Sequence, residues 1–178
     1  KVFIRKIMIE GNERTLEIYK DPVFDIQEQM IGIVGVMKDI TDIIQTQEHI
    51  KTLAYTDFLT SLKNRRSLYH YLENDLANKN IPLTVLFIDL DNFKKLNDSF
   101  GHHVGDKALV HIAEKLANIC DDAFVARVGG DEFVVIWEQI SDEILTQKLD
   151  LLLNKMRTEF SRGEYANIVS VSIGVVRN

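Results

Sequence analysis

The chain has 178 residues, enough for one full domain with a buried core and a smaller second unit. It carries 27 Asp and Glu against 21 Lys and Arg, for a formal net charge of −6. This excess of acid argues against a nucleic-acid groove, because phosphate polymers are bound through dense Lys and Arg. The one cysteine, Cys120, excludes an internal disulfide and a thiolate zinc cluster, and is typical of a reducing compartment.

No stretch approaches the roughly 18 to 20 apolar residues of a membrane-spanning helix, so we expect no membrane segment in the chain. The chain opens at Lys1 without Met and without a charged and then apolar leader, so it reads as a piece of a longer protein. We expect a cytoplasmic location, with any membrane anchor outside these residues.

Residues 1–38 are predicted to form β-structure. Their strand-like runs are Val2–Ile4, Arg14–Tyr19 and Met30–Met37, separated by the turn-like pairs Gly11-Asn12 and Asp21-Pro22. From Asp42, apolar residues recur at helical spacing among polar ones, which predicts a connecting helix to about Thr56. An apolar stripe on such a helix can pair with a copy of itself.

The rest of the chain alternates helical and strand patterns. The predicted helices are Arg65–Ala77, Val104–Ile119 and Ser141–Met156, and the predicted strands are Thr84–Leu90, Phe124–Val128, Phe133–Trp137 and Ile168–Val176. From Thr84 onward the order β-α-β-β-α-β indicates an α+β fold of the ferredoxin-like type, with one antiparallel sheet and its helices on a single face.

This topology predicts where the acidic residues gather. With right-handed β-α-β crossings, the third strand lies between the first two and runs opposite to both. The carboxyl end of the first strand, with Asp89 and Asp91, is then expected beside the hairpin turn Gly129–Glu132. Residues far apart in the sequence would meet at one edge of the sheet.

Convergent carboxylates repel one another and are tolerated when a cation neutralises them. Oxygen ligands suit Mg²⁺, which is commonly held by one or two carboxylates and the substrate's phosphates, and two such ions can clamp the attacking and leaving oxygens of a phosphoryl transfer. Gly129 and Gly130 supply bare backbone that a triphosphate can approach and are expected to have positive φ in a tight turn. Asp131 or Glu132 can accept a proton from an attacking hydroxyl.

Four motifs in order, over roughly Leu53 to Val176, resemble those of the GGDEF family. They are Asp57-Phe58-Leu59-Thr60 with Asn64-Arg65-Arg66, then Asp89 to Asp98 with Phe100-Gly101-His102 and Gly105-Asp106, then Arg127-Val128-Gly129-Gly130-Asp131-Glu132-Phe133, and finally Ser172-Ile173-Gly174. The resemblance implies a palm-like diguanylate cyclase domain, which joins two GTP molecules into cyclic di-GMP with release of pyrophosphate.

The resemblance also implies roles for individual residues. Asp89, Asp131 and the Leu90 carbonyl would hold two magnesium ions per site, with manganese as a possible substitute. Asp131 or Glu132 would help to deprotonate the ribose 3′-hydroxyl, and Lys94 would offset charge on the phosphates. The implied substrate-binding residues are Phe93, Asn97, His102, Asp106, Gly129 and Gly130. Asn97 and Asp106 would read guanine, since a carboxylate can accept hydrogen bonds from its N1–H and N2–H₂ groups.

In the family each subunit holds one GTP and two subunits face each other, so the resemblance implies that catalysis needs a homodimer.

Residues 1–41 resemble the last strands of a PAS sensor domain, through Leu16-Glu17, Asp21-Pro22, Gly35 and the exit Lys38 to Asp42. The implied organisation is a partial PAS domain at 1–41, a signalling helix at 42–56 that changes how two cyclase domains meet, and a GGDEF domain at 57–178.

The chain departs from the family pattern at two places. Many members carry an inhibitory product site, R-x-x-D, beginning nine residues before the first signature glycine, and that register here holds Cys120, Asp121, Asp122 and Ala123. The family also continues past the last strand into a helix whose Lys and Arg bind the triphosphate, so we expect the domain to be truncated at its C-terminus.

Two alternatives stay open: a catalytically silent GGDEF domain that binds GTP and regulates a partner, and another nucleotidyl transferase or cyclase on the same kind of sheet.

Overall fold

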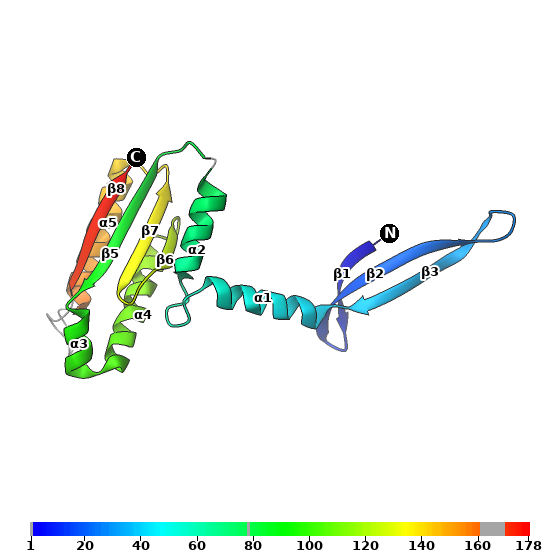
Figure 1. Ribbon diagram of the computed structural model, residues 1–178, viewed down its shortest axis with the longest axis horizontal. Helices are drawn as coiled ribbons and strands as arrows, with labels where there is room; N and C mark the ends of the chain where they lie inside the picture. Colours follow the sequence, from blue (N-terminus) through cyan, green and yellow to red (C-terminus); the bar gives the residue numbers. More distant parts are fainter. Residues whose placement is uncertain (1, 78, 161–169) are drawn as a thin grey trace. The chain divides into compact units, whose positions relative to one another are not determined.

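The computed structural model describes residues 2–77, 79–160 and 170–178. They form two compact units, which divide between Thr52 and Leu53 (Figure 1). Among the helices described, none combines the length and the apolar character needed to cross a membrane.

The first unit is a three-stranded antiparallel meander followed by a helix. Its elements are β1 (Val2–Ile9), β2 (Asn12–Phe24), β3 (Met30–Asp39) and most of α1 (Thr41–Tyr55). Thr41 joins the helix to the sheet, because its buried hydroxyl accepts a hydrogen bond from the Thr15 N–H at 2.8 Å and donates one to Asp39 Oδ1 at 2.6 Å. The predicted strands and connecting helix are confirmed.

The turn predicted at Asp21-Pro22 is wrong. Both residues lie inside β2, where Asp21 pairs with Val34 and Pro22 with Ile33, and the chain turns only at 25–29. The pairing of β2 with β1 covers Asn12 to Tyr19, so among the described residues Pro22 has a strand on one side only. A missing N–H is tolerated at such an edge, which is why proline does not end the strand here.

The second unit is built on a five-stranded sheet in the order β4-β6-β7-β5-β8. Its elements are β4 (Lys63–Asn64), α2 (Arg65–His70) with a π-helical segment (Tyr71–Leu76), β5 (Leu83–Asp91), α3 (Phe93–Phe100), α4 (His102–Ile119), β6 (Phe124–Arg127), β7 (Glu132–Glu138), α5 (Asp142–Phe160) and β8 (Ser170–Arg177). The predicted α+β, ferredoxin-like class is confirmed. The expected start of the last strand at Ile168 lies outside the described residues.

The order of the strands agrees with the topology argument. Strand β7 lies between β5 and β6 and is antiparallel to both, while β4 adds a short parallel pairing to β6. Where one helix was predicted after β5 there are two, because Gly101 takes a φ of 86° between α3 and α4. Glycine adopts this conformation readily, so the chain can change direction and enter a second helix at once.

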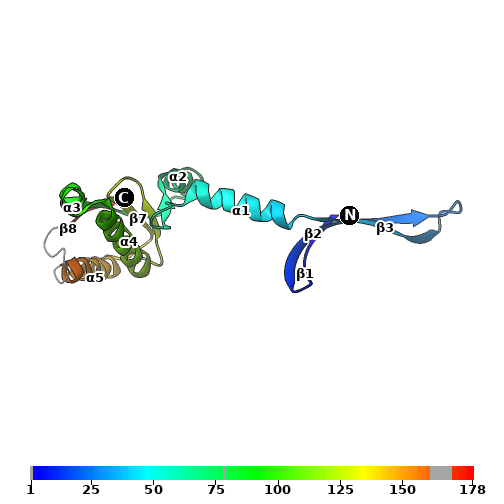
Figure 2. The ribbon, with the colours of Figure 1, turned by 90° about the horizontal axis from the view of Figure 1, so that it is seen from below.

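The sheet has a fully covered face and a partly covered one. On the first face, alternate residues of β5 pack against α4 and α5. The buried side chains of this core include Leu86, Ile88, Leu90, Leu109, Ile112, Leu116, Phe133, Trp137 and Leu152. On the other face, Val134 and Ile136 contact the segment after β4, and the rings of Tyr71 and Phe124 stack at 4.3 Å. Figure 2 shows α4 and α5 on one side of the sheet and α2 on the other. The single-face expectation therefore holds for the helices after Thr84, and α2 adds a second layer.

Candidate active site

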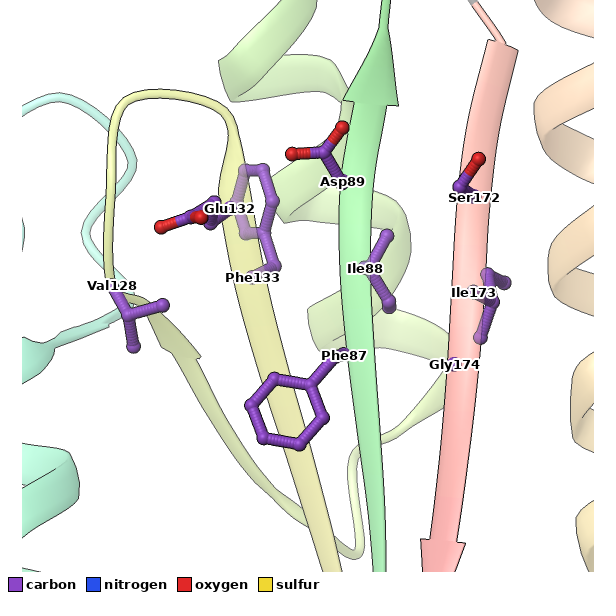
Figure 3. A pocket seen from close by; sticks show the side chains of 9 residues that line it. All are labelled: Phe87, Ile88, Asp89, Val128, Glu132, Phe133, Ser172, Ile173 and Gly174. Carbon is purple, nitrogen blue, oxygen red and sulfur yellow. The ribbon is translucent and has the colours of Figure 1, made fainter.

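The predicted metal ligands meet where β5 ends beside the hairpin between β6 and β7. Asp89 pairs with Glu132 across the two strands, and the Leu90 N–H lies 3.3 Å from the Asp131 carbonyl oxygen. Figure 3 shows Asp89 on β5 beside Glu132 and Phe133 on β7, with Ser172 on β8 at the other side. Alternation on β5 explains this placement, because Ile88 and Leu90 enter the core and Asp89 between them must face outward.

Asp89 and Asp91 lie on the same face of β5 but have different surroundings. Asp91 accepts hydrogen bonds from the hydroxyls of Ser170, at 2.6 Å, and Ser172, at 2.7 Å, and these bonds lower its pKa. Partial burial raises the pKa of Asp89, and the nearby charges of Asp131, Asp91 and Glu132 raise it further. Asp89 thus belongs to a set of carboxylates that repel one another, and a cation would relieve this repulsion.

The donor set fits a hard divalent cation. Asp89, Asp131 and the main chain at Leu90 offer only oxygen ligands, which suit Mg²⁺ or Mn²⁺. Within the described residues, no three His, Cys, Asp or Glu side chains group as a metal site. Two carboxylates completed by the phosphates of a ligand are, however, the common arrangement for magnesium, so the residues present fit a metal that arrives with a nucleotide.

The hairpin turn does not use its glycines as predicted. Neither Gly129 nor Gly130 has a positive φ, so the expectation that the turn needs one is wrong. A Cβ on Gly129 would collide with the Glu132 carboxylate, whereas the space around Gly130 is open. The Val128 N–H closes the turn on the Glu132 carbonyl at 2.9 Å. Because Glu132 is exposed and its carboxylate ends a flexible side chain that can move aside, this contact does not by itself require glycine, and both glycines leave bare backbone at the tip.

The start of α3 offers a place for an anion. Asn92 has φ 58° and ψ 19°, a left-handed conformation that Asn tolerates, and the helix begins with the next residue. A left-handed residue followed by helical ones turns successive N–H groups toward one side, where they can bind phosphate at the positive end of the helix. Phe93 and the exposed Lys94 occupy the first turn.

Asn97 carries a polar atom that has no partner. Its Oδ1 is buried and accepts no hydrogen bond from the described residues. The atom lies against buried Gly105, since a Cβ there would collide with it and would also lie 3.1 Å from Phe93 Cζ. A buried acceptor left unpaired costs free energy, so this amide is suited to a ligand that brings a donor.

Asp106 lies on the next helix, where it lines a pocket of ≈ 330 Å³ together with Leu59, Lys107, Val110, His111 and Glu114. Leu59 was not predicted as a site residue, although its place in the motif Asp57-Phe58-Leu59-Thr60 was a signal that could have pointed to it. His102 lies at the exposed start of α4 and does not line this pocket, so its contact with a nucleotide stays a prediction.

A second hollow, of ≈ 420 Å³, lies on the partly covered face of the sheet (Figure 3). Asp89, Glu132 and Ser172 stand at its polar end, and Phe87, Val128 and Gly174 extend it along the strands. The hollow therefore joins the carboxylate cluster and is part of the same candidate site.

The register of the inhibitory product site is occupied by structural interactions. Cys120 is buried in the core at the end of α4, and Asp122 accepts hydrogen bonds from the Trp137 indole N–H and the Lys148 ammonium, both at 2.9 Å. Lys148 also donates to the Ile119 carbonyl at 2.8 Å. The Lys148 cation at this surface is thus already bound to protein oxygens.

We therefore expect that cyclic di-GMP does not inhibit a cyclase of this sequence noncompetitively through this surface. Capture of its phosphates usually calls for a guanidinium that forms paired, charge-assisted bonds, and Asp121 and Asp122 would repel them. The measurement is initial rates across GTP concentrations with added product. Noncompetitive inhibition that disappears in Lys148→Met would contradict the prediction.

A ferredoxin-like sheet with carboxylates at the end of its central strand, beside a glycine hairpin and a helix start, has the architecture of a palm-like nucleotidyl transfer domain. The family model described as "Diguanylate cyclase, GGDEF domain" matches residues 54–178, and the chain belongs to this family.

Curated relatives include proteins with different named activities. A "Diguanylate cyclase" of Vibrio cholerae is 40% identical over 133 residues, covering 72% of this chain and 41% of that protein. "Signaling protein YkoW" of Bacillus subtilis is 31% identical over 178 residues, 95% of this chain and 22% of its own length. "Cyclic di-GMP phosphodiesterase PdeR" of Escherichia coli is 34% identical over 139 residues, which cover 77% of this chain and 21% of that protein. The chain spans less than half the length of each of these relatives.

Solved structures share the fold. The coiled coil and GGDEF domain of DgcB from Caulobacter crescentus, in complex with c-di-GMP, matches with a TM-score of 0.70 at 23% identity, covering 78% of this chain and 77% of that one. Diguanylate cyclase SiaD of Pseudomonas aeruginosa, in complex with its activator SiaC, matches with a TM-score of 0.62 at 28% identity. The match covers 78% of this chain and 57% of that one.

Proposed function

We propose that this domain is an active diguanylate cyclase, which condenses two GTP into one cyclic di-GMP and releases two pyrophosphates. The observation that carries the proposal is the cluster of Asp89 with Asp131 and Glu132, where desolvation and then the neighbouring negative charges raise the pKa of Asp89. A metal ion bound by these carboxylates would relieve their repulsion and would lie where it could stabilise charge on a reacting phosphate.

The alternative is a catalytically silent domain that binds GTP and regulates a partner. Relatives named as cyclic di-GMP phosphodiesterases give this alternative weight, because a matching domain also occurs in proteins named for another activity. The acidic cluster and the glycine hairpin of this chain favour the cyclase.

The residues of the chain would divide the work as follows. Asp89, Asp131 and the Leu90 carbonyl would hold the magnesium ions, which supply charge stabilisation on the reacting phosphate. Asp131 or Glu132 would accept the proton of the 3′-hydroxyl. Lys94 would balance charge on the phosphates, which the backbone at the start of α3 would bind.

The nucleotide would lie between the hairpin and the two helices. Asn97 and Asp106 would pair with the guanine edge, Phe93 would contact the base or ribose, and His102 would reach the same nucleotide. Gly129 and Gly130 would let the triphosphate approach the main chain. Manganese would replace magnesium with the same ligands.

One site holds one GTP, so bond formation needs a second domain that presents its own GTP to the first. We infer that the working enzyme is a homodimer, located in the cytoplasm. Residues 1–41, with the sheet of the first unit, would be the end of a PAS sensor. Residues 42–56 would be the signalling helix, and residues 57–178 the catalytic domain. Asp39 accepts from the N–H and the hydroxyl of Thr41 at the start of α1, which supports a tight connection between sheet and helix.

The test is to incubate the full-length protein with GTP and Mg²⁺ and to identify the product by mass. Cyclic di-GMP and pyrophosphate in a ratio of one to two are expected. Binding of GTP without any product would instead identify the silent domain.

A further inference from the structure

The side chain of Arg127 joins the catalytic hairpin to the turn that follows α1. From the end of β6, its Nε and Nη2 atoms both donate to the Gly130 carbonyl, at 3.2 and 2.7 Å, and its Nη1 donates to Asp57 Oδ1 at 2.9 Å. Only 11% of the Arg127 side chain and 17% of the Asp57 side chain are exposed. One guanidinium thus connects two segments 70 residues apart.

Asp57 is itself firmly held. Its Oδ1 also accepts from the Thr60 N–H at 2.9 Å and the Thr60 hydroxyl at 2.7 Å, and its own N–H donates to the Leu62 carbonyl. Burial raises the pKa of Asp57, but the bonds from Thr60 and Arg127 outweigh it and lower the pKa overall. The carboxylate is therefore a charged and fixed anchor.

The segment directly after this turn is attached to the last residues of α1. The Asn64 amide donates to the Ala54 carbonyl at 3.0 Å and to the Thr56 carbonyl at 3.2 Å, and the Ser67 hydroxyl donates to the Tyr55 carbonyl. These bonds satisfy carbonyls that the end of a helix leaves open. The end of α1, the turn at 57–62 and the hairpin are consequently linked by hydrogen bonds within the second unit.

The Gly130 carbonyl is the atom through which Arg127 can act on the hairpin turn. Gly130 has open space around its Cα, so no side chain of its own fixes this part of the turn. Its carbonyl belongs to the peptide group that continues into Asp131. Two N–H donors from Arg127 hold that oxygen, so this peptide group cannot rotate freely. Because the Asp131 Cα follows directly, the fixed peptide group also limits the direction in which the Asp131 side chain points.

We propose that Arg127, held by Asp57, is a positioning residue that aims Asp131 at the cation site, an inference that rests on the proposed cyclase function. The planar guanidinium bonds the Gly130 oxygen twice and Asp57 once, which the single ammonium of lysine cannot reproduce. Arg127 is not placed at the reacting atoms, and its effect passes through the hairpin.

The experiment compares Arg127→Lys and Asp57→Asn with Lys148→Gln in the full-length protein. Lys148 is a matched control, since its side chain is 17% exposed and makes an ion pair of the same 2.9 Å length with Asp122, near the opposite end of β6. For Arg127→Lys we expect kcat to fall roughly 10- to 100-fold, the magnitude typical of residues that orient a metal ligand, with little change in the KM for GTP. The Mg²⁺ concentration for half-maximal rate should rise.

A second readout needs neither metal nor nucleotide. Hydrogen exchange of the Val128 amide, which closes the turn, should be about tenfold faster in Arg127→Lys than in the natural protein, because the turn loses charge-assisted bonds. It should be unchanged in Lys148→Gln. The combined Asp57→Asn, Arg127→Lys variant should be no worse than Arg127→Lys alone, since both changes act on one linkage.

Normal kcat and normal Val128 exchange in Arg127→Lys would overturn the proposal, and so would an equal loss of kcat in Lys148→Gln. If the natural protein makes no product, the cyclase function fails, and hydrogen exchange still decides whether Arg127 fixes the hairpin.

Discussion

Asp89→Asn and Asp131→Asn should each abolish formation of cyclic di-GMP in the full-length protein while leaving the domain folded. Losing one ligand of a metal-assisted phosphoryl transfer removes several kcal/mol of transition-state stabilisation, which corresponds to a rate loss of roughly 10³-fold or more. The measurement is product formed from GTP and Mg²⁺, with the thermal unfolding midpoint recorded for each variant.

The unfolding midpoint separates a metal ligand from a structural residue. In the absence of metal, burial and the charges of Asp131, Asp91 and Glu132 raise the pKa of Asp89 above its usual value. A carboxyl group whose pKa is raised by folding binds protons more tightly in the folded state, so its ionised form disfavours folding at neutral pH. Asp89→Asn removes that charge, and the metal-free variant should unfold at the same temperature as the natural protein or higher.

Glu138→Gln is the matched control on the same strand as Glu132. Glu138 lies at the far end of β7 and bonds Tyr71 and Lys79 at the surface, so near-normal turnover is expected. Folded Asp89→Asn or Asp131→Asn protein with near-normal turnover would exclude the metal role. A large fall in the unfolding midpoint would show that the carboxylate is structural.

The placement of the carboxylates was predictable because it follows from topology. The apolar run Thr84–Leu90 marks the central strand, and the handedness of the crossings leaves one position for the hairpin strand. The pairing of Asp89 with Glu132 confirms that step. A pattern of strands and helices can therefore bring together residues that are distant in the sequence, without any knowledge of side-chain contacts.

Contacts that depend on side-chain direction could not be read from the same pattern. The bonds from Arg127 to Asp57 and Gly130 join a strand end to a loop and a turn, and no periodicity connects these positions. Leu59 looked like an ordinary loop residue, although it lines the pocket of Asp106. Gly129 suggested a positive φ, yet it has none, and the nearest atom to a Cβ at this position would be the end of the flexible Glu132 side chain.

A preference for GTP over ATP by roughly 10⁴-fold in kcat/KM is the second large effect we expect, since sites that pair buried polar groups discriminate this strongly. Asn97 Oδ1 is a buried acceptor without a partner among the described residues, and Asp106 lies on the next helix. Guanine can donate from N1–H and N2–H₂ to these acceptors, whereas the corresponding edge of adenine has no such pair of donors. ATP would leave both acceptors unpaired.

Asp106→Asn should reduce this preference without impairing the chemistry on ATP. A hydrogen bond to a charged group contributes about 1.5 to 3 kcal/mol, so the variant should lose roughly 10- to 150-fold in kcat/KM for GTP and much less for ATP. Asp98→Asn is the control, because Asp98 is an exposed carboxylate directly after Asn97 and should change neither value. Equal use of ATP and GTP by the natural protein, or equal losses in the two Asp variants, would show that Asp106 does not read the base. A selective loss in Asp106→Asn alone would assign the guanine edge to the pocket between the loop of Leu59 and α4, where that carboxylate lies.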